Sequence, residues 1–150
     1  MSRTPFVPED FIVPSSLIDD SFVLEPLTPE RNEADYSAWT SSVEHIRRTP
    51  GFADSAWPGE ISLEQNRADL TKHAQEFAER EGFIYTVLDL ERAEVLGCVH
   101  ITPSKDPLID ADITSWVRSD RAELDSPLCR RVSQWLSELW PFEAVSYAPR

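Results

Sequence analysis

The chain has 150 residues, a formal net charge of −13 at pH 7 and a hydrophobic fraction of 41%. This length suits one domain with a real hydrophobic core, and the composition argues against an intrinsically disordered chain. The acidic balance argues against nucleic acid and anionic membranes as partners, because both attract basic surfaces. A strongly acidic surface fits solubility alone, or a basic or amine-bearing partner.

The chain shows no sign of secretion or of membrane insertion. Its first residues contain no apolar run of signal-peptide length, since Pro5, Pro8 and Pro14 interrupt them. No stretch is long and apolar enough to span a bilayer. The cysteines, Cys98 and Cys129, lack C-x-x-C spacing and suit ordinary buried thiols in a reducing cytosol. We therefore expect a cytoplasmic protein.

The proline-rich N-terminal segment, residues 1–21, is predicted to form an extended arm, and residues 22–150 are predicted to form the domain itself. The first strand of that domain is predicted at residues 22–27. Pro26 either ends this strand or confines it to a sheet edge, because proline cannot donate a ladder hydrogen bond.

Two helices are predicted next. Thr28 followed by proline has the residue types that begin a helix, and apolar positions continue that helix to about Arg48. Ser62 and Gln65 have the form of a capping box and begin the second helix, which ends at Gly82.

The rest of the chain reads as strands around one helix. Residues 83–90 and 95–101 are predicted to form a hairpin. Residues 109–118 alternate between apolar and polar side chains and form a predicted strand. Ser126 fits the cap of the next helix and Pro127 its first position. The chain then returns as a short strand ending at Tyr147, so a strand, a crossover helix and a parallel strand are expected.

The sequence SWVRSDR, residues 115–121, precedes a helix ending in Trp-Leu and a final strand. This arrangement resembles the acetyl-coenzyme A core of the GNAT superfamily of N-acetyltransferases, in particular the branch that modifies the amino termini of ribosomal proteins, in which a strand ends in W-V-R. The sequence LGCV, residues 96–99, is similar to the family's I-G-x-V pattern. The resemblance covers roughly residues 22–147. It implies a single α/β (α+β) domain with a mixed central sheet and helices on both faces.

The sequence departs from the family at the motif R/Q-x-x-G-x-G/A, whose backbone N–H groups hold the pyrophosphate at a helix N-terminus. Residues 121–127 read RAELDSP, without glycine. Members usually have a further helix and two further strands, whereas this sequence stops at Arg150. We therefore expect weak or absent acetyl-CoA binding, and an open sheet edge that a second subunit of a homodimer could cover.

The resemblance implies that acetyl-CoA would lie at the end of the 109–118 strand and the start of the following helix. The candidate cofactor-binding residues are Trp116, Val117, Arg118, Arg121, Ser126 and Arg130. Guanidinium groups pair well with phosphates, whereas Asp125 would repel them. In the alternative interpretation, Asp125 and Ser126 only cap a structural helix and the arginines are solvated.

Acetyl transfer from a thioester to an amine needs a base and an acid. In GNAT enzymes the base is often a carboxylate near the fourth strand, and the acid a tyrosine beyond the fifth. Asp112 is the first choice of base and Tyr147 a candidate acid; the alternatives are a solvated strand face and simple packing. The family's first helix lines the acceptor groove, so Glu44 and His45 could bind an amine or transfer a proton. They could equally end a surface helix.

Phe52 and Trp57 lie in a loop rich in proline and glycine. Aromatic side chains in loops often line a pocket, so these two could form a wall of the substrate groove. They could equally anchor a long connection. The three histidines show no metal-ligand spacing, and no metal site is predicted.

Three functions remain open. The first is a GNAT-like N-acyltransferase that moves an acetyl group from acetyl-CoA to an amine-bearing small molecule or a protein N-terminus. The second is a degenerate GNAT-like domain that binds a ligand or protein without catalysis. The third is an interaction module for basic partners, supported only by net charge. The missing glycines favour the second.

Overall fold

The structure, a computed structural model, describes residues 5–53, 55 and 57–150. Six strands form one sheet in the order β1-β2-β3-β4-β5-β6. They are β1 (Leu17–Ile18), β2 (Val23–Pro26), β3 (Phe83–Leu88), β4 (Val95–Pro103), β5 (Ala111–Val117) and β6 (Val145–Tyr147). All neighbouring strands are antiparallel except β5 and β6, which run parallel. The predicted mixed sheet is confirmed, including the hairpin and the parallel pair.

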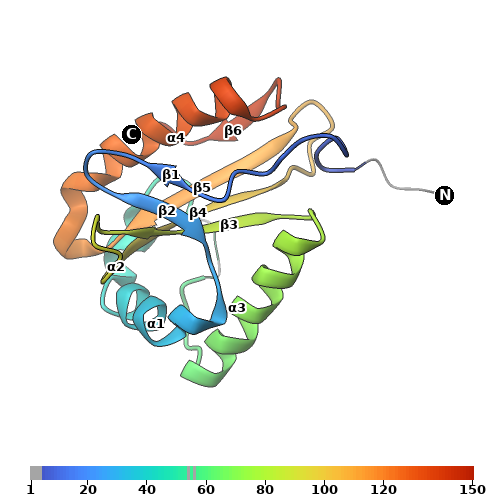
Figure 1. The fold of residues 1–150 in the computed structure, drawn as a ribbon. Coiled ribbons are helices and arrows are strands. Elements are labelled where there is room, and N and C mark those ends of the chain that lie inside the picture. The colour runs from blue at the N-terminus through green and yellow to red at the C-terminus, as the bar shows by residue number, and fades with distance from the viewer. Residues whose placement is uncertain (1–4, 54, 56) are drawn as a thin grey trace.

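Helices cover both faces of this sheet, as predicted. They are η1 (Pro29–Arg31), α1 (Asn32–Thr40), α2 (Val43–Arg48), α3 (Leu63–Ala78), η2 (Ser119–Leu124) and α4 (Asp125–Leu139). Figure 1 shows α4 above the sheet and α1, α2 and α3 below it. None of the helices in the described part of the chain is long and apolar enough to cross a membrane.

The long helix predicted to follow Thr28 is wrong as one element, because η1, α1 and α2 replace it. Thr28 is extended at φ −131° and its side chain caps nothing. The break between α1 and α2 falls at Ser41 and Ser42. The buried Ser42 hydroxyl accepts the amide hydrogen of Ser119 at 2.8 Å, beyond the end of β5. This hydrogen bond attaches the break between the two helices to the segment that follows β5.

The prediction that Ser126 caps α4 is also wrong, because α4 begins at Asp125 and continues directly from η2. The Asp125 amide donates to the Ala122 carbonyl, so the short helix already satisfies an amide that a cap would serve. Ser126 is exposed within the first turn of α4.

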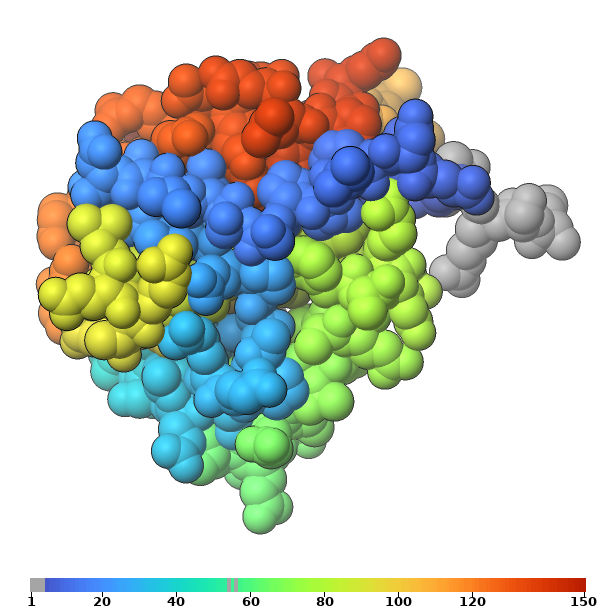
Figure 2. Space-filling model, viewed as in Figure 1, coloured from blue at the N-terminus to red at the C-terminus, as the bar shows by residue number. Residues whose placement is uncertain are grey.

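Each face of the sheet has its own core. Against α4 the strands bury side chains such as Phe83 and Val117, and against α1 and α3 they bury Leu88 and Trp116. The N-terminal arm adds to the first core, where Phe6 stacks on Phe83 with 5.7 Å between ring centroids. In Figure 2 the arm is the blue band between α4 in red and α3 in green. Residues 17–18 of the arm join the sheet as β1.

Gly97 permits the close pairing of β4 with β5. A Cβ atom at Gly97 would overlap the Trp116 carbonyl oxygen and lie 3.0 Å from Val117 Cα. Both obstacles are backbone atoms in the sheet, so neither can move away cheaply. This steric limit explains the glycine in the 96–99 pattern.

Replacing Gly97 with alanine should therefore destabilise the fold by about 2–3 kcal/mol, as expected for overpacking between fixed backbones. Urea unfolding followed by circular dichroism measures this. Gly82→Ala is the matched control, since its Cβ would meet only Thr102 Cγ2 at 3.8 Å. Equal stability of the two variants would contradict this account of the strand contact.

Candidate functional site

The space where β5 and β6 separate is filled by the chain's own side chains. The two strands pair only from Ala111 to Ile113, after which β5 continues alone to Val117. Beyond this point the Tyr147 and Ser115 hydroxyls share a hydrogen bond of 2.6 Å. Burial raises the pKa of Tyr147 above its ordinary value, so this phenol keeps its proton at neutral pH. We call this region, defined by Ser115 and Tyr147 on the separating strands, the fork.

Arg150 completes the filling of the fork. Its side chain is 5% exposed and donates to the Ser115 carbonyl at 2.8 Å and the Ser115 hydroxyl at 3.2 Å. Its guanidinium also lies 5.7 Å from the Tyr147 ring centroid, within cation–π range.

The same arginine reaches the N-terminus of α4. Arg150 Nε donates to Asp125 Oδ2 at 2.7 Å. Asp125 lies in the first turn of α4, where the helix dipole favours a negative charge. Its other carboxylate oxygen is buried and has no hydrogen-bond partner among the described residues. The helix N-terminus therefore already holds an anion, and an internal cation neutralises it.

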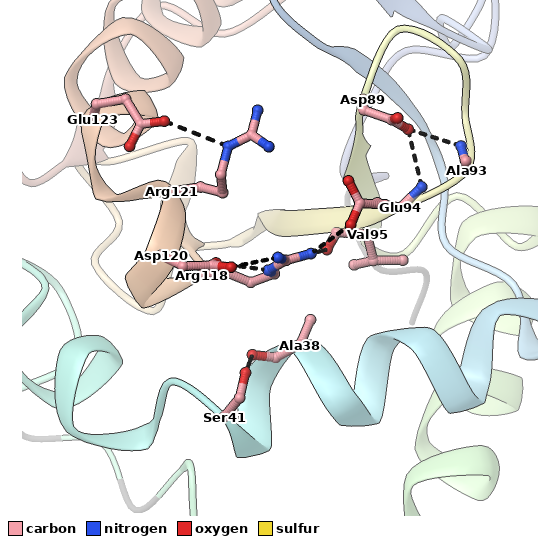
Figure 3. Close-up of polar contacts among 10 residues, drawn as sticks. All are labelled: Ala38, Ser41, Asp89, Ala93, Glu94, Val95, Arg118, Asp120, Arg121 and Glu123. Atoms are coloured by element: carbon pink, nitrogen blue, oxygen red, sulfur yellow. Dashed lines mark hydrogen bonds and ion pairs between the residues drawn. The ribbon is translucent and has the colours of Figure 1, made fainter.

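Two of the three arginines of the predicted cofactor site, Arg118 and Arg121, are likewise engaged by carboxylates, as Figure 3 shows. Arg118 donates to both oxygens of Asp120, at 2.9 and 2.6 Å, and lies 3.7 Å from Glu94. Its guanidinium holds the pKa of Asp120 below the ordinary value. Arg121 lies 3.4 Å from Glu123. Internal carboxylates thus balance these two guanidinium groups, which a phosphate would need.

A separate cavity of about 350 Å³ lies on the opposite face of the sheet, beneath α3 and the loop that precedes it. Its aromatic lining comes from Phe52, Trp57 and Trp116. The ring centroids of Trp57 lie 5.9 Å from those of both Phe52 and Trp116. The buried Trp116 Nε1 has no hydrogen-bond partner among the described residues. We call this cavity the α3 pocket.

Asp35 of α1 brings a buried carboxylate to the α3 pocket. It is 4% exposed and accepts one hydrogen bond, from Asn66 Nδ2 at 3.2 Å. Burial raises the pKa of Asp35 to about 6, and the bond from Asn66 partly opposes that rise. Asn66 is held in turn by Trp39 Nε1 and by the Asn32 side chain, at 3.0 and 2.8 Å. No cation pairs with Asp35 within the described ranges.

His100 of β4 also lines the α3 pocket. Burial, with a smaller contribution from His73, lowers the pKa of His100 to about 3. The two imidazole rings meet edge to face with centroids 6.1 Å apart. His100 is therefore uncharged at neutral pH and does not neutralise Asp35.

The residues proposed from sequence fall into separate places. Tyr147 lines the fork, and Val117 of β5 is buried in the core against α4. Asp112 is half-buried on β5 opposite Ser146 of β6. Ser126 and Arg130 are exposed on α4.

The remaining candidates lie on the other face of the sheet. Phe52, Trp57 and Trp116 meet in the α3 pocket. Glu44 and His45 of α2 do not line it. Glu44 is exposed and lies 3.9 Å from Arg48, whereas His45 Nε2 is buried without a hydrogen-bond partner among the described residues. The catalytic roles of these residues stay predictions.

Sequence reasoning missed Arg150, Ser115, Asp35 and Asn66. The burial of Asp35 could have been predicted from the sequence, because Asn32, Asp35 and Trp39 recur at helical spacing. All three are buried in α1. A carboxylate and an amide in that stripe indicate a buried polar network. Arg150 carried no local signal, since its partners Asp125 and Ser115 lie 25 and 35 residues away.

The raised pKa of Asp35 predicts an unusual dependence of stability on pH. The folded state holds a proton on Asp35 up to about pH 6, whereas the unfolded chain loses it near 3.8. Because the folded state binds more protons between these values, Asp35 should reduce stability as pH rises through that window, by roughly 3 kcal/mol at most. Asp35→Asn should remove this effect, so the difference in unfolding free energy between variant and wild type should grow from pH 4 to 7. Urea titrations at four pH values measure this, and a constant difference would contradict the burial argument.

Solved structures with the same fold are acetyltransferases. A ribosomal-protein-S5-alanine acetyltransferase from Vibrio fischeri superposes with a TM-score of 0.61 at 11% identity, over 81% of this chain and 65% of that one. The Microcin C7 self-immunity acetyltransferase MccE, in complex with acetyl-CoA and AMP, gives 0.61 at 12% identity, over 84% and 67%. A protein described as a GNAT-family acetyltransferase from Bordetella pertussis gives 0.54 at 18% identity, over 82% and 72%.

This chain spans 65% of the length of the Vibrio fischeri structure. No protein-family model matches the sequence, and no curated protein matches it. At sequence identities of 10–18%, the similarity to these structures establishes the fold alone. The chain has the fold of the GNAT acetyltransferases, of the kind found in the ribosomal-protein acetyltransferases.

Proposed function

We propose that this chain is a GNAT-fold domain that binds an amine-bearing ligand and binds acetyl-CoA weakly or not at all. The observation that carries the proposal is the buried pair between Arg150 and Asp125 at the N-terminus of α4. A pyrophosphate at that helix end would meet the Asp125 carboxylate directly. It would also have to displace Arg150 from the Ser115 carbonyl, which removes a buried charge-assisted hydrogen bond.

The backbone around η2 supports the same proposal. The amides of Arg121 and Asp125 are already bonded to the carbonyls of Arg118 and Ala122. Pro127 has no amide hydrogen to offer. Residues 121, 125 and 127 therefore offer no free N–H group to a phosphate at this helix start.

The amine-bearing ligand is supported by charge and by the relatives. The net charge of −13 favours a cationic partner over nucleic acid or an anionic membrane. Structures with this fold include an acetyltransferase of ribosomal L7/L12 described as acting on α-N-protein groups. In this chain the buried carboxylate of Asp35 offers an anionic group to an amine. We extend the proposal to a small amine or a protein N-terminus as the ligand.

A second candidate function is an active N-acetyltransferase, because the α3 pocket and the fork lie on the two sides of β5. Thr114 and Trp116 line the pocket, whereas Ser115 between them bonds to Tyr147 and Arg150. An amine on one side could then meet a thioester on the other if the Arg150 side chain left the fork. In this candidate Asp112 is the base and Tyr147 the acid, as the family resemblance implies. The relative MccE was solved with acetyl-CoA bound.

Thermal unfolding with millimolar acetyl-CoA distinguishes the ligand-binding domain from the active N-acetyltransferase. A ligand at about a hundred times its dissociation constant adds roughly 2.7 kcal/mol, which raises the midpoint by a few degrees in a domain of this size. We expect no shift for the wild type. Asp125→Gly combined with Arg150→Ala should acquire a shift, because it removes both the anion and the cation that fill the site.

Arg130→Ala is the control, since Arg130 is exposed and makes no ion pair among the described residues. It should behave as the wild type does. A wild-type shift of several degrees that is lost in Arg121→Ala would overturn the proposal in favour of the acetyltransferase. An assay for free coenzyme A released in the presence of amines would then be the next measurement.

A further inference from the structure

We infer that the α3 pocket binds a planar organic cation, of the amidinium or protonated heteroaromatic amine type, with its N–H groups directed at Asp35. This inference rests on the proposed function and makes its ligand specific. The first support is the isolation of the Asp35 carboxylate. It is 4% exposed, and its one hydrogen bond comes from Asn66. An ionised carboxylate has about four acceptor sites, so most of its capacity is unused.

The charges that face Asp35 leave this carboxylate without an internal counterion. From α3 come Asp69 and His73, and from β4 come Cys98 and His100. Burial leaves His100 uncharged at neutral pH, and it raises the pKa of Cys98, which stays a neutral thiol, so neither carries a charge that could balance Asp35. No arginine or lysine lines the pocket within the described part of the chain. A buried carboxylate costs free energy unless a cation joins it, so the missing charge is best supplied by a ligand.

The walls of the pocket select the shape of that cation. Phe52, Trp57 and Trp116 present aromatic surface around the cavity, and their ring planes are tilted against one another by 42–51°. Aromatic faces attract cations and stack on flat, delocalised ones.

The Asp35 carboxylate favours a planar cation with N–H groups over a quaternary ammonium ion as the ligand. A quaternary ammonium suits an aromatic box but has no N–H group to satisfy the acceptors of Asp35. An amidinium offers two parallel N–H groups, which match the two oxygens of a carboxylate. The cavity of about 350 Å³ lies within the usual size range of small-molecule sites.

Benzamidinium is a suitable probe, and benzamide is its neutral counterpart of nearly the same shape. Isothermal titration of the whole chain at pH 7.5 should show saturable binding of benzamidinium, at least about tenfold tighter than that of benzamide or tetramethylammonium. A charge-assisted hydrogen bond is worth about 1.5–3 kcal/mol, which corresponds to tenfold or more in affinity. Asp35→Asn should lose this preference, whereas Asp10→Asn, an exposed acid on the arm, should keep it.

The wild type provides a second readout that needs no variant. The pKa of Asp35 is about 6, and a proton competes with the cation for the carboxylate. Affinity should therefore be nearly constant above pH 7 and fall by about fivefold between pH 6 and pH 5. Equal binding of benzamidinium and benzamide, or an affinity that does not change with pH, would overturn the inference. Equal binding of tetramethylammonium would overturn the choice of a planar donor.

This test is independent of the coenzyme A result. The titration contains no coenzyme A, and Arg150→Ala should leave benzamidinium binding unchanged because Arg150 lies in the fork across β5. Tight acetyl-CoA binding would refute the proposed function without changing the pocket. Failure of benzamidinium to bind would refute this inference and leave the fork as described.

Discussion

The ion pair between Arg150 and Asp125 joins the last residues of the chain to the first turn of α4. The Arg150 side chain is 5% exposed and that of Asp125 is 19% exposed, so water screens this pair only weakly. Breaking one partner of a buried pair typically costs about 3–5 kcal/mol, because the other charge is left unpaired. The same guanidinium also bonds the Ser115 carbonyl. One side chain therefore fixes the helix start, the end of the chain and the middle of β5 relative to each other.

The period of two along β5 gives that strand a different neighbour on each face. Ser115 turns toward the fork and its arginine, whereas Thr114 and Trp116 turn toward the α3 pocket. The two faces also differ in charge. The fork contains a neutralised ion pair, and the pocket contains a carboxylate that no cation among the described residues balances. A change that empties the fork would not by itself change the pocket, which is why the two sites can be tested separately.

Sequence patterns predicted those features that depend on neighbouring residues. The alternation in residues 109–118 predicted β5, and Ser62 was predicted to cap α3, where its hydroxyl accepts the Gln65 amide at 3.1 Å. The loop aromatics Phe52 and Trp57 were predicted to line a pocket or to anchor the loop. They line the α3 pocket, although Phe52 is itself 6% exposed and also belongs to the core.

Features that depend on distant residues could not be predicted. At the break before α2, Ser42 accepts a hydrogen bond from Ser119, which is 77 residues away. The pairing of Asp35 with Asn66 spans 31 residues and joins two helices. Asp125 was recognised as a charge unfavourable for phosphate, but its arginine partner came from the far end of the chain. Local propensity contains no information on such contacts, because tertiary packing decides them.

In the folded protein, Arg150 occupies the fork and the start of α4. The Arg150 Nε–H signal in a proton–nitrogen correlation spectrum, assigned by its loss in Arg150→Lys, tests this most directly. Because Nε donates to Asp125 at 2.7 Å in a buried site, we expect a sharp signal that exchanges slowly with water. That signal should not change when millimolar acetyl-CoA is added. A signal that exchanges as fast as an exposed arginine, or that shifts together with the amides of residues 125–128 on addition of acetyl-CoA, would contradict the account.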